Sequence, residues 1–191
     1  MRRLSLIFCL LLFAALPTLG EERWTSVGVY SSVKGAGVSL LSPSKGASKG
    51  DCRECFILRA DFAGILSTGD MPGGKFTWKI HYPLRSGETS DGVRYTIYVG
   101  PGLSTGYVKD YYKERDRGFG LMMSMCSSEG IMFEFKRHPV SIAMEFTQEI
   151  GFHMNNLESL KAMNMGLYNR GIFDSYLPEL KIYWNFGGGG K

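Results

Sequence analysis

The sequence is poor in cysteine and, beyond its first twenty residues, contains no long hydrophobic run. Of 191 residues only four are cysteine. No segment after residue 20 approaches the roughly eighteen consecutive apolar residues that a membrane-spanning helix needs. We therefore expect no transmembrane helix. An exported chain of this kind could re-enter a membrane only as a closed β-barrel, because only that fold satisfies every strand's backbone groups in lipid.

Several functional motifs are also missing. A zinc site would need a second pair of ligands near Cys52 and Cys55, and no phosphate-binding glycine loop opens a helix. His81, His138 and His153 lie on three separate segments, so no metal and no cofactor are expected. Removing residues 1–20 takes away two arginines and no acid, which lowers the net charge from +4 to +2. A charge this close to neutral argues against nucleic acid as a partner.

Residues 1–20 have the pattern of a secretory signal peptide. Arg2 and Arg3 precede an apolar segment, and Gly20 is a small residue immediately before two acids. We expect residues 21–186 to form the folded domain and the glycine-rich residues 187–191 to form a flexible tail. In an oxidising compartment Cys52 and Cys55 could form a local disulfide, or both could remain free thiols.

The chain is rich in residues that favour strands, and the clearest pattern lies between Val140 and His153. Apolar side chains occupy alternate positions there, interrupted only by Gln148, and the intervening residues are small, polar or acidic. This period of two continues for fourteen residues, well beyond the usual strand of about five or six. A strand with one apolar and one polar face suits a wall between lipid and a polar lumen.

The same alternation divides the chain into eight strands. A hairpin within Trp24–Ser42, with a turn at Lys34–Gly37, supplies two, and the other six are expected at 55–66, 75–84, 93–109, 118–136, 140–153 and 177–186. Between 118 and 136, Ser127 and Glu129 interrupt the apolar face. They indicate either a bulge in one strand or a turn between two, and we favour one strand. Residues 154–175 show no clear period and are expected to be the longest loop.

An even number of strands is typical of closed up-and-down membrane barrels. The fold prediction is therefore an all-β, eight-stranded antiparallel transmembrane β-barrel with a polar, ion-paired lumen. The ionisable side chains of this lumen are nearly balanced in charge: Arg59, Asp61, Lys75, Lys79, Arg94, Glu134, Lys136, Glu145, Glu149, Glu179 and Lys181. A soluble secreted lipid-binding barrel of the calycin type would show the reverse, with apolar residues inside and charges outside.

The leader, the long amphipathic strands, the run Tyr98-Val99-Gly100-Pro101-Gly102 and the aromatic end at Trp184 and Phe186 resemble small outer-membrane β-barrels of Gram-negative bacteria. These are of the OmpA, OmpX and OmpW type, and the closest resemblance is to outer-membrane barrels of Bacteroidota. In the family the assembly signal usually ends at the terminal aromatic residue, whereas five residues follow Phe186 here. The resemblance implies an outer-membrane location, with membrane lipid and the barrel-assembly machinery as partners.

His153 is the best candidate for chemistry, with Glu149 on the same strand face to orient it. Barrel lipid A deacylases carry a histidine followed two residues later by a nucleophilic serine, but Asn155 stands at that position here. A hydrogen-bonded lumen histidine is the favoured interpretation. We therefore expect a structural, adhesive or small-solute- or lipid-binding role without catalysis. A lipid-modifying hydrolase and a soluble lipid-binding barrel remain the alternatives.

Overall fold

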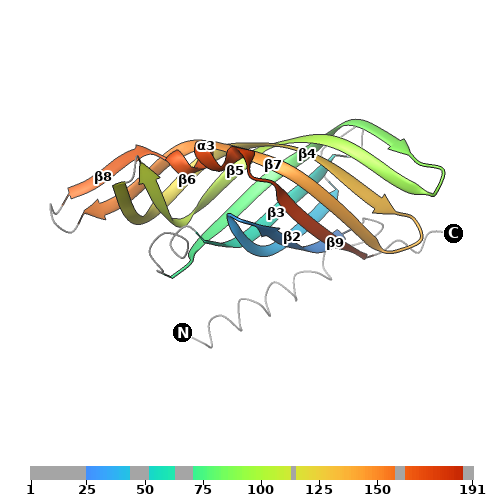
Figure 1. Ribbon diagram of the computed structural model, residues 1–191, viewed down its shortest axis with the longest axis horizontal. Coiled ribbons are helices and arrows are strands. Elements are labelled where there is room, and N and C mark those ends of the chain that lie inside the picture. The colour runs from blue at the N-terminus through green and yellow to red at the C-terminus, as the bar shows by residue number, and fades with distance from the viewer. Residues whose placement is uncertain (1–24, 44–51, 63–70, 113–114, 158–161, 187–191) are drawn as a thin grey trace.

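The computed structural model describes residues 25–43, 52–62, 71–112, 115–157 and 162–186. The predicted leader and tail lie outside these ranges. The described chain is almost entirely antiparallel β-sheet, with one short helix and one 3-10 turn. Its strands wrap around a common axis in Figure 1.

Eight strands close into a barrel. They are β1 (Thr25–Ser32), β2 (Gly35–Pro43), β3 (Arg53–Asp61), β4 (Gly73–Glu88), β5 (Val93–Tyr112), β6 (Arg115–Phe135), β7 (Val140–Leu157) and β9 (Glu179–Phe186). From β1 to β7 each strand pairs with its neighbour in sequence, with β9 between β7 and β1, so that no barrel strand is left at an edge. The predicted eight-stranded antiparallel barrel is confirmed.

The register fixes the tilt of the strands. A path that steps from each residue to the one directly opposite on the next strand goes once around the barrel and returns to β6 ten residues before its starting point. This ring consists of Phe133, Ile142, Ile182, Val29, Val38, Leu58, Phe76, Thr105 and Met123. A stagger of ten residues over eight strands corresponds to a tilt of about 40°, given a rise of about 3.3 Å per residue and a strand spacing of about 4.8 Å.

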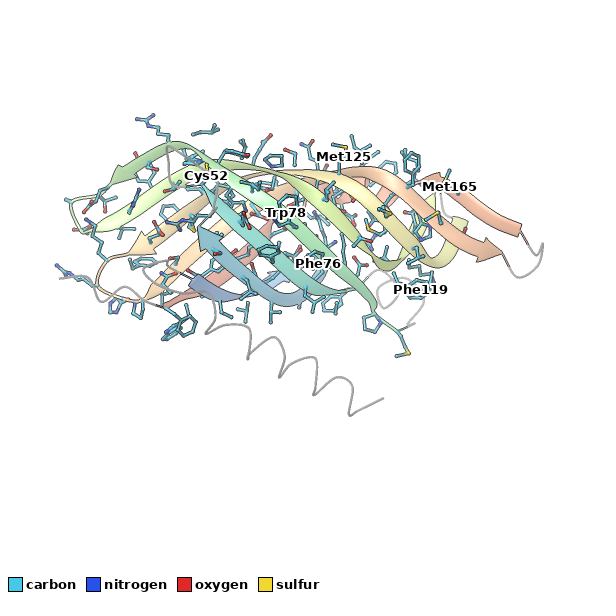
Figure 2. The ribbon with its side chains drawn as sticks, turned by 180° about the vertical axis from the view of Figure 1, so that it is seen from behind. Cys52, Phe76, Trp78, Phe119, Met125 and Met165 are labelled. Atoms are coloured by element: carbon cyan, nitrogen blue, oxygen red, sulfur yellow. The ribbon has the colours of Figure 1, made fainter. Side chains whose placement is uncertain are left out.

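Alternation along each strand separates two environments. The ring just described faces outward, and most of its side chains are substantially exposed, Met123 by 62% and Val29 by 58%. Their immediate neighbours in sequence face the lumen and are buried, including Lys75, Lys181 and Ala143. Figure 2 shows Phe76, Trp78 and Met125 among the side chains of the wall.

The two ends of the barrel differ. At one end β1 begins, β9 finishes, and short turns at 89–92 and 136–139 join the strands. At the other end β5, β6 and β7 continue well past the shorter strands, as Figure 1 shows. The added strand β8 (Ala162–Leu167) pairs with the distal part of β7. Two hairpins therefore project from this end.

The structure resolves the ambiguity in the sixth predicted strand. β6 runs without a turn from Arg115 to Phe135, and its pairing with β7 shows no register shift near Ser127 or Glu129. No bulge is needed, because both residues simply face outward.

The prediction that residues 154–175 form a long loop is wrong. β7 extends to Leu157, β8 follows after an interval outside the described residues, and α3 (Asn169–Phe173) and η1 (Asp174–Tyr176) lead into β9. Residues 110–117, which fall between the strands predicted at 93–109 and 118–136, are likewise mostly strand, in β5 and β6. The first hairpin turns at Val33 and Lys34, so that Gly35 and Gly37 belong to β2.

Candidate functional site

The centre of the lumen is built around Glu145 on β7. Its carboxylate pairs with Lys79 from β4 and Lys181 from β9, and all three side chains are fully buried. The Tyr98 hydroxyl from β5 donates a further hydrogen bond at 2.8 Å. Gly130 provides the space for this ring, because a Cβ there would lie 2.7 Å from Tyr98 Cζ. One carboxylate thus bridges two ammonium groups contributed by different strands.

Four residues further along β7, on the same face, Glu149 organises a second group. It pairs with Lys75 and accepts a hydrogen bond of 3.3 Å from the Ser104 hydroxyl. The Lys75 ammonium also lies 5.3 Å from the centre of the Tyr168 ring, within cation–π range. The free-energy cost of burying the Lys75 ammonium is therefore offset by the Glu149 carboxylate on one side and by the face of the Tyr168 ring on another.

A third group links β1, β3 and β9. Arg59 lies 3.4 Å from Asp61 and 3.9 Å from Glu179, and Lys34 lies 3.4 Å from Glu179. The Tyr30 hydroxyl accepts a hydrogen bond of 2.9 Å from Arg59. These residues lie close to the end from which the long hairpins project.

The segment around α3 closes that end of the lumen. Arg170 pairs with Asp61 at 2.8 Å, and its backbone N–H donates to Asp110 of β5 at 3.2 Å. Gly171 packs against β7, where a Cβ would lie 2.5 Å from the Glu149 carbonyl oxygen. The chain between β8 and β9 is thereby tied to both β3 and β5, and it covers the ion pairs beneath it.

We expect Arg170→Ala to loosen this closure. The substitution removes the pairs with Asp61 and with Asp174 (2.8 Å), although Asp61 keeps Arg59. Proteolytic cleavage between Leu167 and Pro178 should become several-fold faster in the folded barrel. Arg137→Ala, in an exposed turn, is the matched control, and equal cleavage rates in the two variants would show that Arg170 does not hold the segment.

The opposite end of the lumen is also filled. His81 stacks on Tyr98 with ring centres 4.2 Å apart, and Arg53 pairs with Glu134 at 2.7 Å. The cavity between His81, Arg53 and Met132 has a volume of about 10 Å³, which is room for about one water molecule.

Most of the ionisable residues predicted for the lumen lie in these groups. Arg59, Asp61, Lys75, Lys79, Glu145, Glu149, Glu179 and Lys181 are buried. Glu134 is half-buried against Arg53, and Arg94 is half-buried on β5. Lys136 does not lie in the lumen. It follows the end of β6, where alternation stops, and pairs with Glu88 on the exposed rim.

Sequence reasoning missed Lys34, Arg53, Asp110 and Arg170. Arg53 could have been found, because it shares a strand face with Arg59 when β3 is extended by two residues toward the N-terminus. Lys34 and Arg170 had no such signal. They lie in a turn and a helix, where the period of two does not apply.

His153, the weak catalytic candidate, faces the lumen and is almost completely buried. Its Nε2 lies 3.0 Å from the Val108 carbonyl oxygen. A carbonyl can only accept, so Nε2 carries the proton and donates. The ring stacks on Tyr168, with centres 6.5 Å apart. Glu149, its proposed partner, is held by Lys75, so the two are not arranged as a base and its orienting acid.

The cysteines Cys52, Cys55 and Cys126 are free. Cys52 immediately precedes β3 and Cys55 lies within it. Three residues of extended chain span about 10 Å, beyond the roughly 7 Å limit between Cα atoms that a disulfide can bridge. Of the two alternatives, the structure has the free thiols.

Within the described ranges, no group of three His, Cys, Asp or Glu side chains could hold a metal ion. Over the same residues no helix is long and apolar enough to cross a membrane.

The fold and the interior define the class: a closed, eight-stranded antiparallel β-barrel with a charged, paired lumen and an apolar outer wall. Among solved structures, a similar one is the N-terminal β-barrel domain of Pseudomonas aeruginosa OprF. The match has 12% sequence identity, covers 86% of this chain and 96% of that chain, and has a TM-score of 0.47. No family model matches the chain, and neither does a curated protein.

Proposed function

We propose that this protein is an integral outer-membrane β-barrel with a structural or adhesive role and a closed lumen. The observation that carries the proposal is the outer wall. Exposed aliphatic and aromatic side chains occur on every barrel strand, including Val29, Val38, Leu58, Phe76 and Ile182. Soluble monomers rarely expose a contiguous apolar patch larger than a few hundred Å², whereas lipid requires such a surface all around a barrel.

The shape of the outer wall also suits lipid. A groove of about 710 Å³ crosses β4 to β7 on the outside, and its exposed lining is almost entirely apolar. Phe76, Leu103, Met125 and Ile150 are among the side chains that line it. A surface of this kind offers contacts to acyl chains and almost no hydrogen bonds to a polar ligand.

The sequence also carries the export and assembly signals that this location requires. Residues 1–20 direct export, and the aromatic end at Trp184 and Phe186 directs insertion by the barrel-assembly machinery. Outer-membrane barrels have short periplasmic turns and longer extracellular loops. The turns at 89–92 and 136–139 would therefore face the periplasm, and the projecting hairpins of β5–β6 and β7–β8 would face outward, where they could contact other surfaces.

A structural role is favoured over catalysis because of where His153 points. An enzyme acting on membrane lipid needs its histidine at the lipid-facing surface, but His153 is directed into the lumen and hydrogen-bonded to Val108. It is not positioned to meet a substrate carried by the bilayer.

Because the lumen is closed, we expect the purified protein not to conduct ions across a membrane. Three groups of paired charges, Tyr98 and the α3 segment fill the axis of the barrel. In planar lipid bilayers we expect no stable channel openings above the background of protein-free membranes, with an open porin as the positive control. Reproducible unitary openings that scale with the protein added would contradict a closed barrel.

A further inference from the structure

One part of the otherwise apolar outer wall carries polar side chains. Ser127 and Glu129 on β6 and Gln148 on β7 all face outward and are exposed. Ser127 is directly opposite Gln148, and Glu129 is directly opposite Phe146 on the neighbouring strand. We call these three residues the outer polar patch. Within the part of the chain that the structure describes, their side chains make no hydrogen bond or ion pair.

The outer polar patch lies at mid-height in the wall. The ring of opposed residues crosses β6 at Phe133 and again at Met123. With strands tilted by about 40°, each residue adds about 2.5 Å of height, so these two positions span about 25 Å, the height of a membrane barrel's apolar band. On this scale Glu129 lies about 10 Å above Phe133 and Ser127 about 15 Å above it.

The outward-facing neighbours of the patch along β6 and β7 are apolar. Met125 and Ile131 flank it along β6, and Phe146 and Ile150 flank it along β7; of these, Met125 and Ile150 are among the most exposed. Ionisable residues at such depth in lipid are costly and are normally paired or functional. Polar side chains in membranes also associate through hydrogen bonds to a partner that is likewise in the bilayer. The outer polar patch therefore requires a protein partner.

We propose that the partner is a second copy of this chain, packed wall to wall around a two-fold axis along the membrane normal. The proposal rests on the membrane location argued above. Such an axis brings residues of equal height together, and Ser127 and Gln148 are neighbours at nearly equal height. Serine and glutamine each donate and accept hydrogen bonds, so Ser127 of either copy faces Gln148 of the other. The patch is thus complementary to itself, as a two-fold interface requires.

Glu129 makes the proposal specific. The two copies of this residue lie near the axis, where two carboxylates repel and are stable only if they share a proton. Glu129→Gln removes the charge and keeps the hydrogen-bonding capacity, so it should preserve the dimer or strengthen it. A cationic segment of another protein would behave in the opposite way and would lose its main attraction in this variant.

The test is photo-crosslinking in membranes. A benzoylphenylalanine at position 127 should yield a covalent dimer of this chain at a level at least several-fold above the same probe at Val38, an outward position on β2, four strands away. The triple variant Ser127→Leu, Glu129→Leu and Gln148→Leu should remain folded, since leucine suits lipid, and should remain monomeric.

Three results would overturn the second copy as partner. They are equal dimer yield at positions 127 and 38, adducts only to another protein or to lipid, and an undiminished dimer in the triple-leucine variant. A barrel that stays in the membrane but remains monomeric refutes this inference alone. A protein that never enters the membrane refutes the proposed function itself.

Discussion

Glu145→Ala should be the most damaging single substitution in the lumen, destabilising the barrel by about 3–5 kcal/mol. Glu145 is the shared partner of Lys79 and Lys181, and all three side chains are fully buried. Without the carboxylate, two ammonium groups face each other in a site that water does not reach. Breaking a buried pair in this way costs far more than the pair itself contributes, because the remaining charges are uncompensated.

Urea unfolding of the purified barrel in detergent, followed by the change in gel mobility, measures this loss. Glu88→Ala is the matched control, since Glu88 pairs with Lys136 on the exposed rim, and such pairs contribute about 0–1 kcal/mol. Adding Lys79→Met and Lys181→Met to the Glu145→Leu background should restore most of the stability. A Glu145→Ala barrel no less stable than Glu88→Ala would mean that the central charges are solvated and the lumen is open.

Val38→Arg should destabilise the barrel in lipid by about 2–4 kcal/mol, the cost of a basic side chain near the bilayer midplane. Val38 lies in the outward ring of opposed residues and is 49% exposed. The size of the effect discriminates between lipid and water as the environment of this side chain. On a soluble barrel the same exposed position would accept arginine within about 0.5 kcal/mol, as most surface positions do.

Reversible unfolding from phospholipid vesicles is the appropriate measurement, with Ser90→Arg in the exposed turn at 89–92 as the control. Both variants add one positive charge, so any effect of net charge on stability cancels when the two are compared. We expect a large difference in stability between the two variants. If Val38→Arg and Ser90→Arg unfold at the same urea concentration, the outer wall is not in contact with lipid.

The alternation of side chains was sufficient to predict the barrel. Within the apolar band most outward positions carry apolar side chains and most inward positions carry polar ones, so the period of two is strong. Beyond the band that constraint disappears. The outer parts of β5 and β6 therefore fell outside the predicted strands, and residues 154–175 were predicted to be a loop although they contain β8 and α3.

The pairing inside the lumen could not be predicted in the same way. Alternation places Lys79 and Glu145 on inward faces, but they are 66 positions apart and meet only because of the register around the closed barrel. The sequence also gave no signal for Arg170, which reaches Asp61 from a helix. Conversely, Ser127 and Glu129 visibly interrupt the apolar pattern of the sequence. The interruption suggests a bulge or a turn in the backbone, but in the structure it is a polar part of the outward-facing surface.

Fractionation of cells that express the full chain tests the central claim most directly. We expect the mature protein to remain with the outer membrane after extraction with a mild detergent such as sarkosyl. We also expect the protein to migrate faster on a gel when unheated than after boiling, because the closed barrel stays folded until heated. Mature protein that is freely soluble without detergent, with no heat-dependent shift, would contradict the account.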